Sequence, residues 1–153
     1  MLYVILALCL LLADQITKYL TVAHIARHAD IPVIPGVLSL TFLENKGAAW
    51  GIFHNERLFL IVLSAAILAA LTWIVIRKPC QNRLYRTSLS LIYAGALGNL
   101  IDRIFRPGGV VDMLKLDFIE FPVFNLADCC VVAGVILLCI YILFLHDKEK
   151  SIE

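Results

Sequence analysis

Residues 58–76, LFLIVLSAAILAALTWIVI, form an apolar run without a charged side chain. At the α-helical rise of about 1.5 Å per residue, a run of this length reaches across nearly the whole hydrocarbon core of a bilayer, which is about 30 Å thick. The stretch therefore predicts a helix that crosses a membrane.

The composition of the whole chain agrees with a membrane protein. Hydrophobic residues make up 61% of its 153 positions, whereas soluble globular domains contain roughly 45–50% even with glycine counted. A soluble fold of this size cannot bury that much apolar surface, so the excess is expected to face lipid. The net charge of +1 carries no electrostatic footprint for DNA or RNA, so no nucleic-acid partner is expected.

Three weaker apolar runs accompany the first one and cover residues 2–22, 84–104 and 121–145. No basic residue precedes the N-terminal run, so it is interpreted as a retained helix and not as a cleaved signal peptide. The length agrees with one domain. We therefore predict an all-α membrane protein, with residues 1–153 as a single integral membrane domain of four transmembrane helices.

The orientation follows from the positive charges between the runs. The short stretch RKPCQNRLYR, residues 77–86, holds four Lys or Arg residues and no acid, whereas the longer segment 23–57 holds only three. Because basic loops stay in the cytoplasm, loop 77–83 is predicted to be cytoplasmic. Both termini are then cytoplasmic as well, and segments 23–57 and 105–120 are extracytoplasmic.

Polar residues interrupt three of the four runs. Asp14 and Lys18 are spaced i,i+4 in the first run and can form an internal ion pair, which favours a structural role. In the third run, Asn99, Asp102 and Arg103 share one helix face. Asp102 is interpreted mainly as a member of a structural ion pair or as a helix-end residue.

The fourth run contributes Asn125 and Asp128, again on one face. The predicted orientation places Asp14 roughly 12 Å and Asp128 roughly 10 Å below the outer ends of their helices. Ionisable groups at such depths are costly and mark a functional site by default, although they can also fasten helices to one another.

Asp112 lies outside the runs, in RPGGVVDMLKL at residues 106–116. Its apolar neighbours have strand preference and can return the loop to the membrane surface, which would bring Asp112 next to Asp128. A solvated loop acid is the alternative. Two neighbouring carboxylates cannot both ionise cheaply, so one keeps a proton while the other acts as a base toward water.

The extracytoplasmic segment that follows the first run predicts a small β-strand platform. In IPVIPGVLSLTFLEN, residues 31–45, Leu38, Leu40 and Phe42 alternate as in a half-buried strand. The next stretch, ENKGAAWGIF at 44–53, combines the amide of Asn45 with small residues that permit close approach, among them Gly47. A tight turn explains the glycines equally well, and Trp50 and Phe53 also suit an interfacial anchor.

The cysteines and histidines indicate no metal site. Most of the five cysteines lie inside apolar runs and are interpreted as packing residues, and a bridge between adjacent Cys129 and Cys130 is not expected. His24 and His28 are spaced i,i+4, but no Glu follows His24 as in HExxH.

Five motifs in order resemble those of the bacterial lipoprotein signal peptidases, also called type II signal peptidases. They are DQITK at 14–18, ENKGAAWGIF at 44–53, GALGNLIDR at 95–103, GVVDM at 109–113 and FNLAD at 124–128. The resemblance implies a membrane aspartyl endopeptidase without metal or cofactor, located in the bacterial inner membrane. It implies cleavage of prolipoproteins just before a diacylglyceryl-modified cysteine, by a protein that we expect to be a monomer among membrane lipids.

The same resemblance implies roles for individual residues. Asp112 and Asp128 would be the catalytic pair, beneath an outer loop that covers the active site. The expected substrate-binding residues are Asn45, Gly47, Asn99, Arg103 and Asn125. Asp14, Lys18 and Asp102 would support them.

Two other functions compete with the peptidase. A small four-helix proton-coupled membrane carrier would use Asp14 and Asp128 as relay acids, but it should also place acids near the opposite face. A non-catalytic helix-bundle partner would give Asp112 no role.

Overall fold

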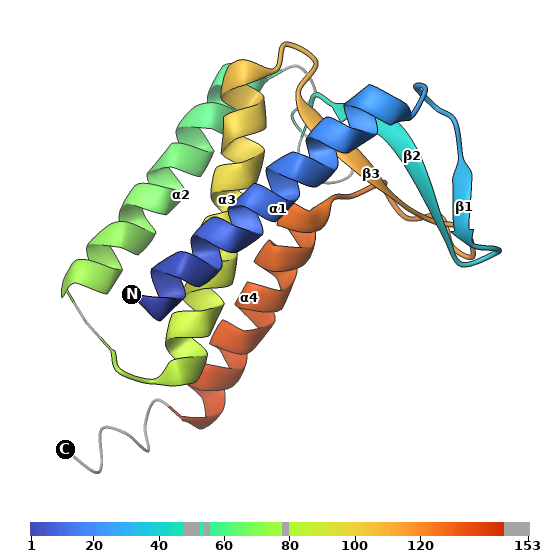
Figure 1. Cartoon of the computed structure of the whole chain (residues 1–153). Helices are drawn as coiled ribbons and strands as arrows, with labels where there is room; N and C mark the ends of the chain where they lie inside the picture. Colours follow the sequence, from blue (N-terminus) through green and yellow to red (C-terminus); the bar gives the residue numbers. More distant parts are fainter. Residues whose placement is uncertain (48–52, 54–55, 78–79, 146–153) are drawn as a thin grey trace.

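A computed structural model describes residues 1–47, 53, 56–77 and 80–145 of the chain. Trp50, expected to anchor the chain at the interface, lies outside these residues. The described part contains four helices and three strands (Figure 1). In chain order they are α1 Leu2–His24, β1 Ile31–Ile34, β2 Leu38–Asn45, α2 Arg57–Arg77, α3 Arg83–Phe105, β3 Val110–Leu116 and α4 Leu126–Phe144.

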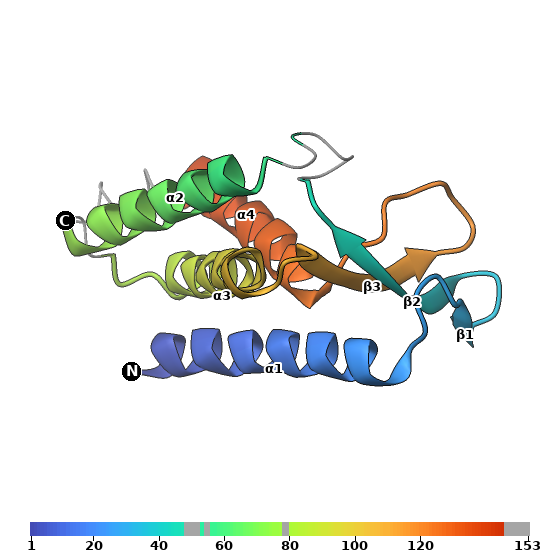
Figure 2. The ribbon, with the colours of Figure 1, turned by 90° about the horizontal axis from the view of Figure 1, so that it is seen from above.

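Helix α3 is the centre of the bundle and packs against the other three helices. Seen from above, it lies between α1 and α2 (Figure 2). Small residues make this close packing possible, since a Cβ atom on Gly95 would lie 2.2 Å from the carbonyl oxygen of Ala127 in α4. About two helical turns away, a Cβ atom on Gly134 of α4 would lie 2.8 Å from the carbonyl oxygen of Ser88 in α3.

The four predicted helices are present, and three of them, α1, α2 and α4, are long and apolar enough to cross a membrane. Their outward side chains are apolar and exposed, as at Leu12, Val62 and Leu143. Helix α3 is as long as α1, 23 residues each, but it carries more polar residues, of which Ser88, Ser90 and Asp102 are buried. The structure therefore contains a four-helix bundle with three candidate membrane spans, and the fourth crossing stays a prediction.

The expected start of the last helix at residue 121 was wrong, because α4 begins at Leu126. The preceding residues are extended, and Phe124 exchanges backbone hydrogen bonds with Leu114 at 2.8 and 3.0 Å. Pro122 lies in this stretch and disfavours a helical conformation at Phe121, the residue before it. Asp128 consequently lies in the first turn of α4 and not deep inside a span.

The platform is a three-stranded antiparallel sheet of order β1-β2-β3. It projects from the end of the bundle where α1 and α3 end, while residue 1 and the end of α4 lie at the opposite end (Figure 1). Segment 105–120, expected as an outer loop, contains β3 at Val110–Leu116, in which Asp112 pairs with Leu43 of β2.

The prediction that apolar residues alternate along β2 is only partly confirmed. Phe42 is buried with Val111 and Met113, but Leu40 is only half-buried and Ser39 is buried. The register shifts between Leu40 and Leu43, so the period of two is broken inside the strand.

Helix α1 ends at His24, and His28 follows with φ +61°. The two histidines therefore do not share a helix face, contrary to their spacing in sequence. All five cysteines are free thiols.

We expect Gly95→Ala to destabilise the bundle, because the added methyl collides with the backbone of α4. Overpacking of this kind lowers the free energy of unfolding by about 1–3 kcal/mol. Thermal unfolding in detergent would measure the change. Ala70→Val, on the exposed surface of α2, is the matched control, and equal midpoints for the two variants would contradict the packing role of Gly95.

Candidate active site

Asp128 is held by the first turn of α4. Its backbone N–H donates to Asn125 Oδ1 at 2.9 Å, and its own Oδ2 accepts the backbone N–H of Asn125 at 3.1 Å. This reciprocal capping box satisfies two donors of the helix start.

Asp112 reaches the same place from β3 and is 1% exposed. Its Oδ1 accepts Asn125 Nδ2 at 2.6 Å, and its Oδ2 accepts Asn45 Nδ2 at 3.0 Å. Asn125 thus binds both carboxylates, one through its side chain and the other through its backbone. The structure therefore brings together two acids that are 16 residues apart in sequence.

Burial and the nearby charge of Asp128 raise the pKa of Asp112 to about 7. The hydrogen bonds from Asn45 and Asn125 and the charge of Lys18 act in the opposite direction. Near neutral pH, one carboxyl of the pair therefore holds a proton for part of the time while the other is free to accept one.

Asn99 of α3 joins this pair to the interior of the bundle. Its Nδ2 donates to Asp128 Oδ1 at 2.8 Å, and its Oδ1 accepts Lys18 Nζ at 2.9 Å and Asn125 Nδ2 at 3.2 Å. These bonds fix which end of the amide faces the carboxylate. Asn99 therefore presents a donor to Asp128 and an acceptor to Lys18.

Lys18 is completely buried between two carboxylates, with Nζ 3.0 Å from Asp14 Oδ2 and 3.0 Å from Asp102 Oδ2. The predicted Asp14–Lys18 pair is present, but its extension to Asp102 was not foreseen. Asp102 also pairs with Arg106 at 3.1 Å, a partner that their i,i+4 spacing could have indicated.

Carboxylate oxygens of this ion cluster also hold the backbone beside each member of the carboxylate pair. Asp14 Oδ1 accepts the N–H of Ala127 at 2.9 Å, and Asp102 Oδ2 accepts the N–H of Val111 at 3.2 Å. Ala127 and Val111 directly precede Asp128 and Asp112. The cluster therefore positions both carboxylates through the main chain, a connection that the spacing in sequence does not reveal.

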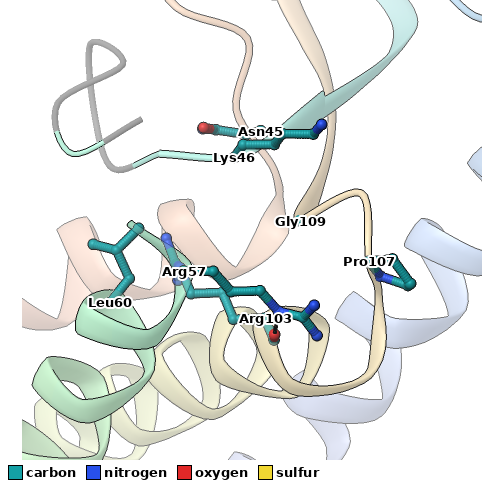
Figure 3. A pocket seen from close by; sticks show the side chains of 7 residues that line it. All are labelled: Asn45, Lys46, Arg57, Leu60, Arg103, Pro107 and Gly109. Atoms are coloured by element: carbon teal, nitrogen blue, oxygen red, sulfur yellow. Dashed lines mark hydrogen bonds between the residues drawn. The ribbon is translucent and has the colours of Figure 1, made fainter. Parts of the chain in front are cut away.

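Arg103 and Gly47 border the pair on the side of β2. Arg103 Nη2 donates to the carbonyl of Gly47 at 3.3 Å, and the N–H of Gly47 donates to Asn45 Oδ1 at 2.9 Å. Next to them is a cavity of about 190 Å³ (Figure 3). Its lining residues are Asn45, Lys46, Arg57, Leu60, Arg103, Pro107 and Gly109.

Two contributors to this region were missed by sequence reasoning. Arg57 donates to the carbonyls of Arg103 and Ile104 at 2.6 and 2.9 Å, which ties the start of α2 to the end of α3. Gly98 leaves room for Asp14, whose Oδ2 would lie 2.4 Å from a Cβ placed there. Among the described residues, no group of three His, Cys, Asp or Glu side chains could hold a metal ion.

We expect Lys18→Met to destabilise the protein strongly, because it leaves Asp14 buried without its cation and removes one of the two cations of Asp102. Breaking a buried pair in this way costs about 3–5 kcal/mol. The control is Lys115→Met, which removes a partly exposed pair with Asp30 and should change the unfolding midpoint little. The expectation fails if both variants unfold at the same temperature.

The family model described as "Signal peptidase (SPase) II" matches residues 6–144. The lipoprotein signal peptidase of Lactobacillus johnsonii is 39% identical, over 97% of this chain and 96% of its own. That of Lactococcus lactis subsp. lactis is 45% identical, over 92% and 91%.

A solved structure described as a bacterial membrane enzyme, obtained by the in meso method, superposes with a TM-score of 0.87 and 36% identity, over 97% of this chain and 90% of that one. A second such structure gives 0.85 and 36%, over 94% and 93%. Fold and sequence thus agree over nearly the whole length, and the chain belongs to the signal peptidase II family.

Proposed function

We propose that this protein removes the signal peptide from prolipoproteins, as an aspartic endopeptidase whose catalytic residues are Asp112 and Asp128. The observation that carries the proposal is the pairing of these two carboxylates through Asn125, from β3 and from the start of α4. Family membership supports the peptidase activity, and relatives carry the name lipoprotein signal peptidase.

The pair can hydrolyse an amide with one shared proton. The ionised carboxylate takes a proton from a water molecule, whose oxygen attacks the carbonyl carbon of the scissile bond. The protonated carboxyl donates to the carbonyl oxygen as it becomes negative. The carboxyl formed from the base then protonates the amide nitrogen as the C–N bond breaks, and a hydroxyl of the tetrahedral intermediate returns its proton to the other carboxylate. The products are the carboxylic acid of the signal peptide, which ionises in water, and a free amine, and the pair again holds one proton.

The amides around the pair support this chemistry by restricting each carboxylate. Asn99 donates to Asp128 at 2.8 Å, and Asn125 donates to Asp112 at 2.6 Å. The orientation of each carboxylate is therefore fixed before substrate binds. Asn125 is completely buried. Its part in substrate binding is therefore to hold the carboxylates that act on the peptide.

We assign direct contact with the peptide to Asn45, Gly47 and Arg103. Asn45 and Arg103 line one part of the cavity of about 190 Å³, and Gly47 is hydrogen-bonded to both of them. The three residues present amide, backbone and guanidinium groups beside the pair. Such groups suit the carbonyls and N–H groups of an extended peptide. Asn99 would act beside them through Asp128.

The protein is proposed to act in the bacterial inner membrane as a monomer with both termini in the cytoplasm. Loop 77–83 is then cytoplasmic, and the sheet and the carboxylate pair lie at the extracytoplasmic end. A substrate with a diacylglyceryl-modified cysteine would approach from the outer leaflet, with its acyl chains in lipid and the bond before the cysteine at the pair. The reaction as written requires no metal or cofactor.

The carrier alternative lacks support. A relay needs acids toward both faces of the membrane, whereas Asp14, Asp102, Asp112 and Asp128 gather within one hydrogen-bonded network at one end of the bundle.

We expect Asp112→Asn and Asp128→Asn each to lower the cleavage rate of a lipidated precursor by about 10²–10⁴-fold, because each removes half of the acid–base pair. Release of the signal peptide by purified enzyme in detergent would measure the rate. Asp117→Asn, at an exposed acid just beyond β3, is the matched control. Cleavage by either pair variant at the rate of the control would refute the assignment.

The pKa of Asp112 predicts how the rate depends on pH. Because this pKa is about 7, raising the pH above it removes the proton that the mechanism requires. We expect kcat/KM to fall with a slope of about one decade per unit on the alkaline side of pH 7. A profile that stays flat from about pH 6 to about pH 9 would contradict a shared proton at Asp112.

A further inference from the structure

Three cations, Lys46, Arg57 and Arg103, line the cavity beside Asn45, and the first two of them have no part in the proposed peptide contacts. We propose that this cavity binds the phosphate of an anionic phospholipid headgroup at the membrane surface. This inference goes beyond the proposed function, since it concerns Lys46 and Arg57 and does not depend on catalysis by Asp112 and Asp128.

All charged residues among the described lining of the cavity are cations. Lys46 lies on one side of the hollow, and Arg57 and Arg103 lie on the other (Figure 3). A volume of about 190 Å³ is several times the share of one water molecule, which is about 30 Å³. The space therefore accommodates a phosphate with part of its hydration shell.

The positive charge of the cavity is not cancelled by ion pairs. In the described part of the chain, none of the three cations has a carboxylate oxygen within 4.0 Å. Arg57 donates only to the neutral carbonyls of Arg103 and Ile104. The carboxylates whose charges reach Arg103 are those of Asp128, Asp112 and Asp102. Asp102 already pairs with Lys18 and Arg106, and neither Asp112 nor Asp128 forms an ion pair with Arg103 among the described residues.

Arg103 supplies an independent observation that favours an anion in the cavity. Its Nε is buried and has no hydrogen-bond partner within the described residues. Its other nitrogens make only long bonds, of 3.4 Å to the carbonyl of Asn99 and 3.3 Å to that of Gly47. A buried guanidinium nitrogen without an acceptor is costly, and an anion in the adjoining cavity would reduce the cost.

The position of the cavity favours a lipid over a soluble anion. Arg57 begins α2, and Arg103 lies in the last turn of α3, so the cations lie at helix ends, where headgroups meet the hydrocarbon. Leu60 forms an apolar part of the lining, and Phe59 and Val62 are exposed on α2 nearby. A phospholipid whose phosphate binds in the cavity could thus place its acyl chains along α2.

The test measures lipid binding without substrate. The purified full chain, in a neutral detergent, is titrated with phosphatidylglycerol or with phosphatidylcholine, and bound lipid is counted by native mass spectrometry. We expect one phosphatidylglycerol to bind preferentially and to raise the thermal midpoint. Lys46→Gln and Arg57→Gln should each weaken it about fivefold, the effect of removing one cation near a lipid phosphate.

Arg83→Gln is the matched control, since it removes an exposed cation from the opposite end of α3. Lys46→Gln keeps the test decisive if Arg57→Gln unfolds, because Lys46 lies outside the helices and strands. Equal affinities of wild type and Lys46→Gln, or equal binding of phosphatidylcholine, would overturn the proposal. So would equally tight binding of inorganic phosphate, which indicates a soluble-anion site, or displacement by a short acidic peptide at lower concentration. Loss of catalysis in Asp112→Asn with normal lipid binding would leave this inference intact.

Discussion

A lysine ammonium group buried in an apolar bundle must be neutralised, and this requirement at Lys18 organises the rest of the protein. Its Nζ lies within 3.0 Å of oxygens from Asp14, Asp102 and Asn99, so α1 and α3 are held in one register. Each of these partners then reaches toward the carboxylate pair, through the N–H of Ala127, the N–H of Val111 or the side chain of Asp128. A change at Lys18 therefore acts on the stability of the bundle and on the geometry of the site together.

The site combines features that would each destabilise an ordinary membrane helix bundle. Asp112 and Asp128 repel one another when both are ionised, and burial strengthens that repulsion. The fold accommodates them by giving each carboxylate amide donors, from Asn45 for Asp112, from Asn99 for Asp128 and from Asn125 for both. It also keeps the pair at the end of the bundle, on a strand and a first helical turn. The elevated proton affinity that results is also what amide hydrolysis uses.

Much of the architecture could be predicted from sequence because the chain separates apolar runs from charged loops. Four helices, a strand platform and the Asp14–Lys18 pair followed from run length and spacing. The start of α4 could not be placed that way, since the apolar residues 121–124 pair with β3 instead of joining the helix. The alternation predicted for β2 is broken by a register shift inside the strand. The predicted common face of His24 and His28 is absent because α1 ends at His24.

The sequence by itself determined that the protein lies in a membrane and which few polar residues interrupt its spans, because hydrophobicity and cost of burial are local properties of each segment. It also contained the motifs by which Asp112 and Asp128 were recognised. Only the tertiary structure decided that Asp102 shares Lys18 with Asp14, that Asn125 binds both carboxylates, and that Lys46, Arg57 and Arg103 line one cavity. These are contacts between elements far apart in the chain, and their distances depend on how α1, α3, β2, β3 and α4 pack.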